Sequence, residues 1–136
     1  MEPSQIWDDE LGVGDEELDR EHHLQLTLVA ALTNALQQGR PAVARRVADQ
    51  LHGYSAAHFA GEELLMEAAS YAPLHSHRQE HQNLLAHMAE MRALVTSGER
   101  ELATVMALDL RSELGAHMAA SDRPFAGLRQ RPRDVQ

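Results

Sequence analysis

The sequence contains no cysteine and no lysine, and its aromatic residues are limited to one Trp, two Tyr and two Phe. Without cysteine, disulfides, thiolate metal sites and cysteine nucleophiles are all excluded. No apolar run approaches the roughly 20 residues that a membrane helix needs. The N-terminus is acidic and unlike a signal peptide. We therefore expect a cytoplasmic protein without a membrane span, and the length of 136 residues fits a single domain.

The charges of the chain are strongly unbalanced. It has 21 carboxylates and 12 basic residues, all of them arginine, which gives a formal net charge of −9. Such a balance repels phosphate groups, so we expect no nucleic-acid partner. The chain also has nine histidines. Histidines and carboxylates in the absence of cysteine indicate metal chemistry with nitrogen and oxygen ligands.

Sparse proline and glycine residues divide the chain into segments with helical periodicity. The breaks predict helices over residues 19–38, 41–70, 74–97 and 99–121, with Asp19 as the N-cap of the first. Four amphipathic helices with short connections predict an all-α, up-down-up-down four-helix bundle over residues 19–122. Residues 1–18 are expected to form an N-terminal arm. Residues 123–136, which contain Arg and Pro, are expected to form a loose tail.

Each predicted helix places at least one histidine on its apolar face. Burying such groups costs free energy unless they are paired or bind a metal. The inward-facing polar set consists of His22, His58, Glu62, His77, His81, His117 and Asp122. The other histidines fall off the apolar faces and are expected at the surface, namely His23, His52, His75 and His87.

The spacing of these residues decides which side chains can meet. His58 with Glu62, and His77 with His81, are four residues apart, so each pair projects from one helical face. Alone, the first pair also fits a helix-stabilising hydrogen bond, and the second fits a chance arrangement.

His117 and Asp122 are five residues apart, about 140° around a regular helix. Asp122 therefore reaches the same site only if the helix bulges near its end, which Pro124 favours. One metal ion cannot use five imidazoles and two carboxylates, whereas two ions can if Glu62 and Asp122 each bridge both. Imidazole with carboxylate suits iron, manganese, cobalt or zinc.

The motifs resemble those of the haemerythrin family, in particular its single-domain bacterial members. The resemblance covers the chain from Trp7 to about Leu128. It includes Trp7, Gly12-Val13-Gly14, Leu18-Asp19-Arg20-Glu21-His22, Tyr54-x3-His58-Phe59-x2-Glu62-Glu63-x2-Met66, Tyr71-x-Pro73, His77-x3-His81 and His117-x4-Asp122.

This resemblance implies a non-haem site of two iron ions (Fe2+/Fe3+) joined by an oxo or hydroxo bridge. By position, His77, His81 and His117 would hold a coordinatively full iron. His22 and His58 would hold the other, which keeps an open position. Glu62 and Asp122 would bridge the two irons, and O2 would bind at the open iron as a hydroperoxide.

An apolar pocket around the open iron would keep water and protons away from bound O2. Leu114, one turn before His117, and Met118 are placed to form its wall, and Phe59 is expected to belong to it. The family commonly has a tryptophan four residues before the last histidine, where this chain has Glu113. Glu113 would either admit water to the pocket, face solvent or bond a ligand histidine. Tyr54 is expected to pack beside the site or to donate its hydroxyl to a bridging carboxylate.

The resulting hypothesis is reversible O2 binding for transport, storage or supply, with an oxygen-consuming protein as a partner and no enzymatic turnover. The chain has no E-x-x-H motif, which carboxylate-rich di-iron sites of helical bundles use. Five neutral imidazoles donate less charge than four carboxylates and favour O–O cleavage less. The alternative hypotheses are an O2 or redox sensor and a di-iron enzyme, such as a peroxidase, a ferroxidase or a nitric oxide-handling protein, with fast autoxidation.

Overall fold

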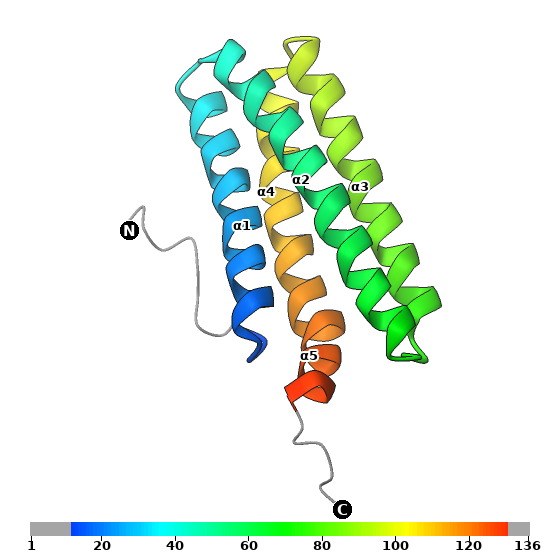
Figure 1. Ribbon diagram of the computed structural model, residues 1–136. Helices are drawn as coiled ribbons and strands as arrows, with labels where there is room; N and C mark the ends of the chain where they lie inside the picture. Colours follow the sequence, from blue (N-terminus) through cyan, green and yellow to red (C-terminus); the bar gives the residue numbers. More distant parts are fainter. Residues whose placement is uncertain (1–11, 131–136) are drawn as a thin grey trace, which may run out of the picture.

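The computed structural model describes residues 12–130, which form a bundle of long helices (Figure 1). The long helices are α1 (Glu16–Gln37), α2 (Pro41–Ala68), α3 (Leu74–Thr96) and α4 (Arg100–His117). A π-helical turn, Met118–Asp122, connects α4 to the short helix α5 (Arg123–Gln130). Successive long helices run in opposite directions, and no strand occurs among residues 12–130. The predicted all-α, up-down-up-down bundle is confirmed, whereas Trp7 lies outside the described residues.

The first helix begins earlier than predicted. Asp15 has an extended backbone, and its side chain accepts hydrogen bonds from the amides of Glu17 and Leu18, at 3.1 and 3.2 Å. It is therefore the N-cap of α1. The prediction of Asp19 as the cap is wrong, because its carboxylate instead accepts from the amide of Val13 at 2.8 Å. Both aspartates have suitable side chains, and only the backbone conformation distinguishes them.

The segment after the π-helical turn is not a loose tail over its described part. Phe125 and Ala126 are buried in α5, and the Phe125 ring lies 5.0 Å from that of Tyr71. Arg129 forms an ion pair with Asp15 at 3.0 Å. Helix α5 thus docks at the beginning of α1. The predicted loose tail is wrong for residues 123–130, because Phe125 and Ala126 are buried and Arg129 pairs with Asp15.

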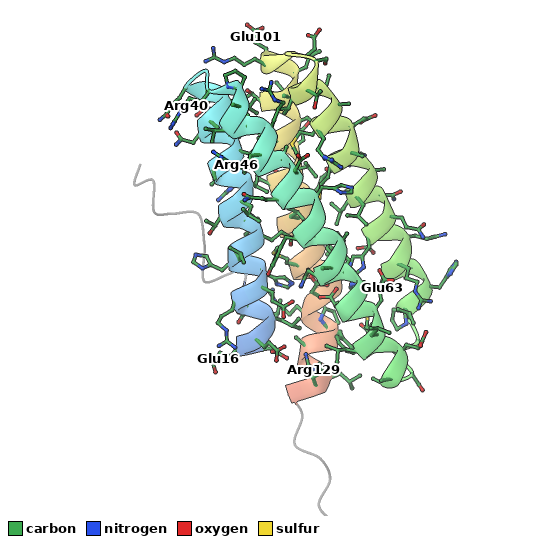
Figure 2. The ribbon with its side chains drawn as sticks, turned by 45° about the horizontal axis from the view of Figure 1, so that its top comes forward. Glu16, Arg40, Arg46, Glu63, Glu101 and Arg129 are labelled. Atoms are coloured by element: carbon green, nitrogen blue, oxygen red, sulfur yellow. The ribbon has the colours of Figure 1, made fainter. Side chains whose placement is uncertain are left out.

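Two glycines end helices where the chain must reverse direction. Gly39 follows α1 with φ +67° and Gly98 follows α3 with φ +80°, conformations that favour glycine. The Arg100 guanidinium donates to the carbonyl of Gln37 at 2.6 Å and ties these two connections together. In Figure 2, Arg40 and Glu101 mark this end of the bundle, and Glu16, Glu63 and Arg129 mark the opposite end.

The interior of the bundle changes character along its length. Helix α1 packs mainly on α2 and α4, and α3 packs mainly on the same two helices. Toward the Gly39 end the core is apolar, with fully buried Leu32, Ala44 and Ala103. The buried histidines and carboxylates of the interior lie outside this apolar part of the core.

Within residues 12–130, none of the helices is both long and apolar enough to cross a membrane.

Candidate metal centre

The seven polar residues that the sequence placed inward meet in the interior of the bundle. His22 comes from α1, His58 and Glu62 from α2, His77 and His81 from α3, His117 from α4 and Asp122 from the π-helical turn. All seven are buried, and the most exposed among them, His58 and His117, are only 6% exposed. The structure thus brings together residues that are up to 100 positions apart in the chain (122 − 22).

Three of the imidazoles form one group, which we call the three-histidine group: His77, His81 and His117. Their ring centroids lie 4.5, 4.6 and 4.9 Å apart. The Nε2 atoms of His81 and His117 approach to 3.1 Å. The rings therefore turn their Nε2 atoms toward a common point.

The remaining imidazoles, His22 and His58, form the two-histidine group. Their ring centroids lie 5.1 Å apart, and the rings meet edge to face. Among the described residues, Nε2 of His58 and Nδ1 of His22 have no hydrogen-bond partner, and Nε2 of His22 makes no well-aligned hydrogen bond, although Asp122 Oδ2 lies 3.1 Å away. This group comes from α1 and α2, whereas the three-histidine group comes from α3 and α4.

Glu62 lies between the two groups and turns one oxygen toward each. Its Oε1 atom lies 2.9 Å from Nε2 of His77 and 3.1 Å from Nε2 of His81. Its Oε2 atom lies 3.8 Å from Nε2 of both His22 and His58. This is the geometry of a carboxylate that can bridge two positions.

Asp122, in the π-helical turn, also turns one oxygen toward each histidine group. Its Oδ1 atom lies 3.0 Å from Nε2 of His77 and 3.1 Å from Nε2 of His117, and its Oδ2 atom lies 3.1 Å from Nε2 of His22. The π-helical turn Met118–Asp122 makes this possible by rotating Asp122 beneath His117. The predicted bulge is confirmed. Pro124 contributes to it because proline has no amide hydrogen to donate within the helix.

The charges of the cluster follow from its burial and its pairings. Burial lowers the pKa of His22, but the carboxylates of Asp122 and Glu62 outweigh it and raise this pKa to about 9. The same balance raises the pKa of His77 to about 9. For Glu62, burial raises the pKa, and the imidazoles, led by that of His22, lower it to about 2. The metal-free cluster therefore holds ionised carboxylates and protonated imidazoles, and a cation must displace those protons.

The donor set fits a metal ion at each group. One ligand atom from each of Glu62, His77, His81, His117 and Asp122 lies within 4.8 Å of all the others, and the same holds for His22, His58 and Glu62. Metal bonds of about 2.0–2.2 Å require such a separation of ligand atoms. Within the described part of the chain, Glu62 Oε2 and Asp122 Oδ1 are buried and accept no well-aligned hydrogen bond, although imidazole Nε2 atoms lie 3.8 Å from the first and 3.0 Å from the second. Cations would satisfy these atoms.

Three further carboxylates lie beside the Nδ1 atoms of histidines in the cluster, on the side away from its centre. Nδ1 of His58 lies 2.6 Å from Glu21, Nδ1 of His81 lies 2.6 Å from Glu63, and Nδ1 of His117 lies 2.7 Å from Glu80. Such contacts fix the ring so that Nε2 faces the metal, and they increase its basicity.

The roles of these three glutamates were not predicted from the sequence. Their signal is position, because Glu21, Glu63 and Glu80 each directly adjoin a residue of the cluster in sequence. A neighbouring residue lies about 100° around the helix and faces the adjacent helix rather than the centre. Each glutamate thus orients a histidine of a different helix.

The predicted pocket residues take up different positions. Phe59 is buried and stacks on His81 with ring centroids 4.0 Å apart, and Leu114 and Met118 are buried in the same apolar cluster. Glu113 lies half-buried and pairs with His87 at 3.0 Å, so it faces the surface of α3.

Tyr54 packs beside the site, as one of its two expected roles requires. Its ring is parallel to that of His58, with centroids 6.3 Å apart. Its hydroxyl donates to the backbone carbonyl of Glu21 at 3.1 Å, which is not a bridging carboxylate. Tyr54 thereby anchors the backbone next to His22.

Comparisons with known proteins agree with this geometry. A family model described as "Hemerythrin HHE cation binding domain" matches residues 13–128. The chain is 32% identical over 117 residues to the "Bacteriohemerythrin" of Ralstonia nicotianae, covering 86% of this chain and 82% of the relative. It is 30% identical over 135 residues to that of Stenotrophomonas maltophilia (96% and 88%) and 31% identical over 94 residues to that of Pseudomonas paraeruginosa (69% and 61%). The chain belongs to the haemerythrin family.

Proposed function

We propose that the chain binds O2 reversibly at two iron ions held in this cluster. His77, His81 and His117 would hold one ion, His22 and His58 would hold the other, and Glu62 and Asp122 would be shared. The observation that carries this proposal is the unequal donor set: Glu62 belongs to both groups of possible ligands, and Asp122, a member of the larger group, also lies 3.1 Å from Nε2 of His22. An ion at the two-histidine group would have one imidazole ligand fewer than the other and could offer a position for O2. When bound, the iron pair supplies electrons that O2 can accept and return.

The composition of the cluster favours binding over turnover. Five imidazoles and two carboxylates supply less negative charge than the carboxylate-rich sites of di-iron enzymes. The protein also surrounds the cluster with apolar side chains. Phe59, Leu114 and Met118 are each at most 2% exposed, so they limit the access of water and protons to bound O2.

A sensor or an enzyme with fast autoxidation is the second candidate. One observation favours it. Glu113 and His117 line the same surface pocket, which brings solvent close to the outer edge of the three-histidine group. The lifetime of the oxygenated protein separates the two candidates, because a carrier must release O2 more often than it oxidises.

The test uses purified protein that is reduced with dithionite and desalted under anaerobic conditions. Iron is counted per chain, and visible spectra are recorded in air and again under argon. The proposal predicts two irons per chain and an absorption band that appears in air and disappears under argon over several cycles. Immediate and irreversible conversion to the oxidised form would favour the sensor or enzyme instead. A protein that takes up no iron would contradict both.

A further inference from the structure

A surface pocket between α1 and α2 leads to the two-histidine side of the cluster. We call it the entrance pocket; its volume is about 350 Å³, and its lining includes Glu17, Glu21, Ala57, His58, Gly61 and Glu62. The small residues Ala57 and Gly61 leave the groove open on the α2 side. A hydrogen-to-methyl change at Gly61 would meet nothing within 4 Å, so this side of the groove is not filled by neighbouring atoms.

Carboxylates line the entrance pocket at increasing depth, from the solvent to the buried cluster. Glu17 is exposed, the Glu21 side chain is 36% exposed, and the Glu62 side chain is 1% exposed. Glu17 and Glu21 are one turn apart on α1, so they lie on one side of the helix. In the part of the chain that the structure describes, no arginine lines this pocket. The carboxylates along the pocket therefore favour the entry of a cation over that of an anion.

The inner end of the pocket has atoms that require a ligand. His58 Nε2 and Glu62 Oε2 are buried and have no hydrogen-bond partner among residues 12–130. His58 and Glu62 line the pocket themselves. These unpartnered atoms are an observation independent of the acidic mouth, and both types of atom are metal donors.

We propose that the entrance pocket is the path by which a divalent cation reaches the metal centre. This inference rests on the proposed function, because it supplies the metal that the function requires. O2 is neutral and gains nothing from a series of carboxylates, whereas a hydrated cation exchanges its water for their oxygens. Glu21 would pass the cation to Glu62 while it continues to orient His58 at 2.6 Å.

Two other surface pockets reach histidines of the cluster but lack these features. One is lined by Glu80 and His117, the other by Glu80 and His77, and neither is lined by Glu62 or Asp122. The first is lined by two carboxylates, Glu80 and Glu113, and the second by one, whereas the entrance pocket is lined by three. These pockets therefore reach the outer edges of the histidines, where a cation would find fewer carboxylate donors.

The first test closes the pocket and measures the rate of metal uptake. Metal-free protein is mixed with Co2+ in a stopped-flow instrument under anaerobic conditions, and the cobalt absorption is followed. G61L should slow uptake about tenfold, because a cation then needs the helices to separate before it enters. The final cobalt content should equal that of the unchanged protein.

The matched control is G53L, which lies on the same helix outside the pocket. A Cβ atom at Gly53 also meets nothing within 4 Å, and both changes replace a helical glycine by leucine. G53L should load at the original rate. If G61L also loads at the original rate, the entrance pocket is not the path.

The second test removes one charge at the mouth. E17Q should slow Co2+ uptake about threefold at low ionic strength, and the difference should shrink in salt. The control is E16Q, because Glu16 precedes Glu17 in the first turn of α1 but does not line this pocket. Equal slowing by both variants would show a general charge effect and contradict the proposed path.

The two proposals fail in distinguishable ways. If the unchanged protein takes up no metal, both the proposed function and the path are overturned. If it takes up two ions per chain and binds O2 reversibly, but G61L and E17Q load at the original rate, the path alone is overturned.

Discussion

The two halves of the metal centre are built from similar residues but differ in how completely the protein itself organises them. In the three-histidine group, His81 and His117 are held at their outer edges by Glu63 and Glu80, and their Nε2 atoms lie 3.1 Å apart. In the two-histidine group, only His58 is held in this way, by Glu21. His22 is fully buried, its Nδ1 atom has no hydrogen-bond partner among the described residues, and its Nε2 atom lies 3.1 Å from Asp122 Oδ2.

This difference indicates a division of roles between the halves. Rings fixed before metal binding lose little further freedom, so the three-histidine group is the better organised site. The two-histidine group is both less constrained and adjacent to the entrance pocket. We therefore expect the three-histidine group to hold an ion more tightly and the two-histidine group to exchange a ligand more readily. The following predictions test this contrast, from the largest expected effect to the smallest.

Replacing Glu62, the carboxylate that faces both histidine groups, should remove metal from both of them. E62A should lose both ions, because Glu62 turns one oxygen toward each group. It should also lower the free energy of unfolding by about 3 kcal/mol, because charged imidazoles stay buried without this partner. Metal content after gel filtration and denaturant unfolding measure the two effects. E67A, five residues later on the same helix at an exposed position, is the control and should change neither.

Removing one imidazole from each group in turn should show that the two groups differ in how firmly they hold metal. H58A should lose the ion of the two-histidine group and retain the other, because the three-histidine group keeps all its donors. H81A should lose more metal, since no group then offers three imidazoles. Iron per chain after brief chelator treatment compares the variants. Equal iron contents would contradict the proposed difference between the halves.

The outer carboxylates should contribute through the histidines that they orient. E80Q should weaken metal binding about 10–100-fold, since Glu80 lies 2.7 Å from Nδ1 of His117. Chelator competition measures the affinity. Because E80Q makes its imidazole a weaker donor, the reduction potential of the loaded protein should also rise, which a purely structural role would not explain. E90Q, at an exposed position of α3, should leave both unchanged.

The apolar wall should matter for bound O2 and not for metal content. L114A should keep the iron and shorten the lifetime of the oxygenated protein several-fold, because it opens space beside the site. It should also cost about 2–5 kcal/mol of stability, as other buried leucines do. L110A is the matched control, since Leu110 and Leu114 are both fully buried on α4. Lifetimes that fall equally in both variants would mean that Leu114 has no specific role.

Protons should replace the metal as the stabilising charge in the metal-free protein. The pKa values of His22 and His77 rise from 6.5 to about 9 in the folded state. Their contribution to stability is fully present below pH 6.5 and is lost as the pH rises through about 9. The free energy of unfolding of the metal-free protein should therefore fall across this window. The loaded protein should show no such fall, which denaturant titrations at several pH values would test.

Much of this arrangement could be predicted from the sequence because it depends on local spacing. The pairs His58–Glu62 and His77–His81 project from one face of any regular helix. The five-residue step from His117 to Asp122 required a bulge, and the π-helical turn provides it. Helical periodicity therefore predicted which side chains face inward, and the resemblance to the family implied that they form one site.

The features that the sequence did not predict depend on contacts between helices. The pairing of Glu63 with His81 requires the register of α2 against α3, and periodicity within one helix contains no information about it. The pairing of Glu113 with His87 requires the register of α3 against α4 in the same way. Helix α5 was missed because its burial depends on contacts of Phe125 and Arg129 with distant residues.

The most direct measurement of the central claim is anomalous diffraction at the iron edge from crystals of the loaded protein. The account predicts two peaks, both beside Glu62 and Asp122. One should lie among His77, His81 and His117, and the other should lie beside His22 and His58. A single peak, or two peaks that do not share these carboxylates, would contradict a bridged centre with one complete and one open half.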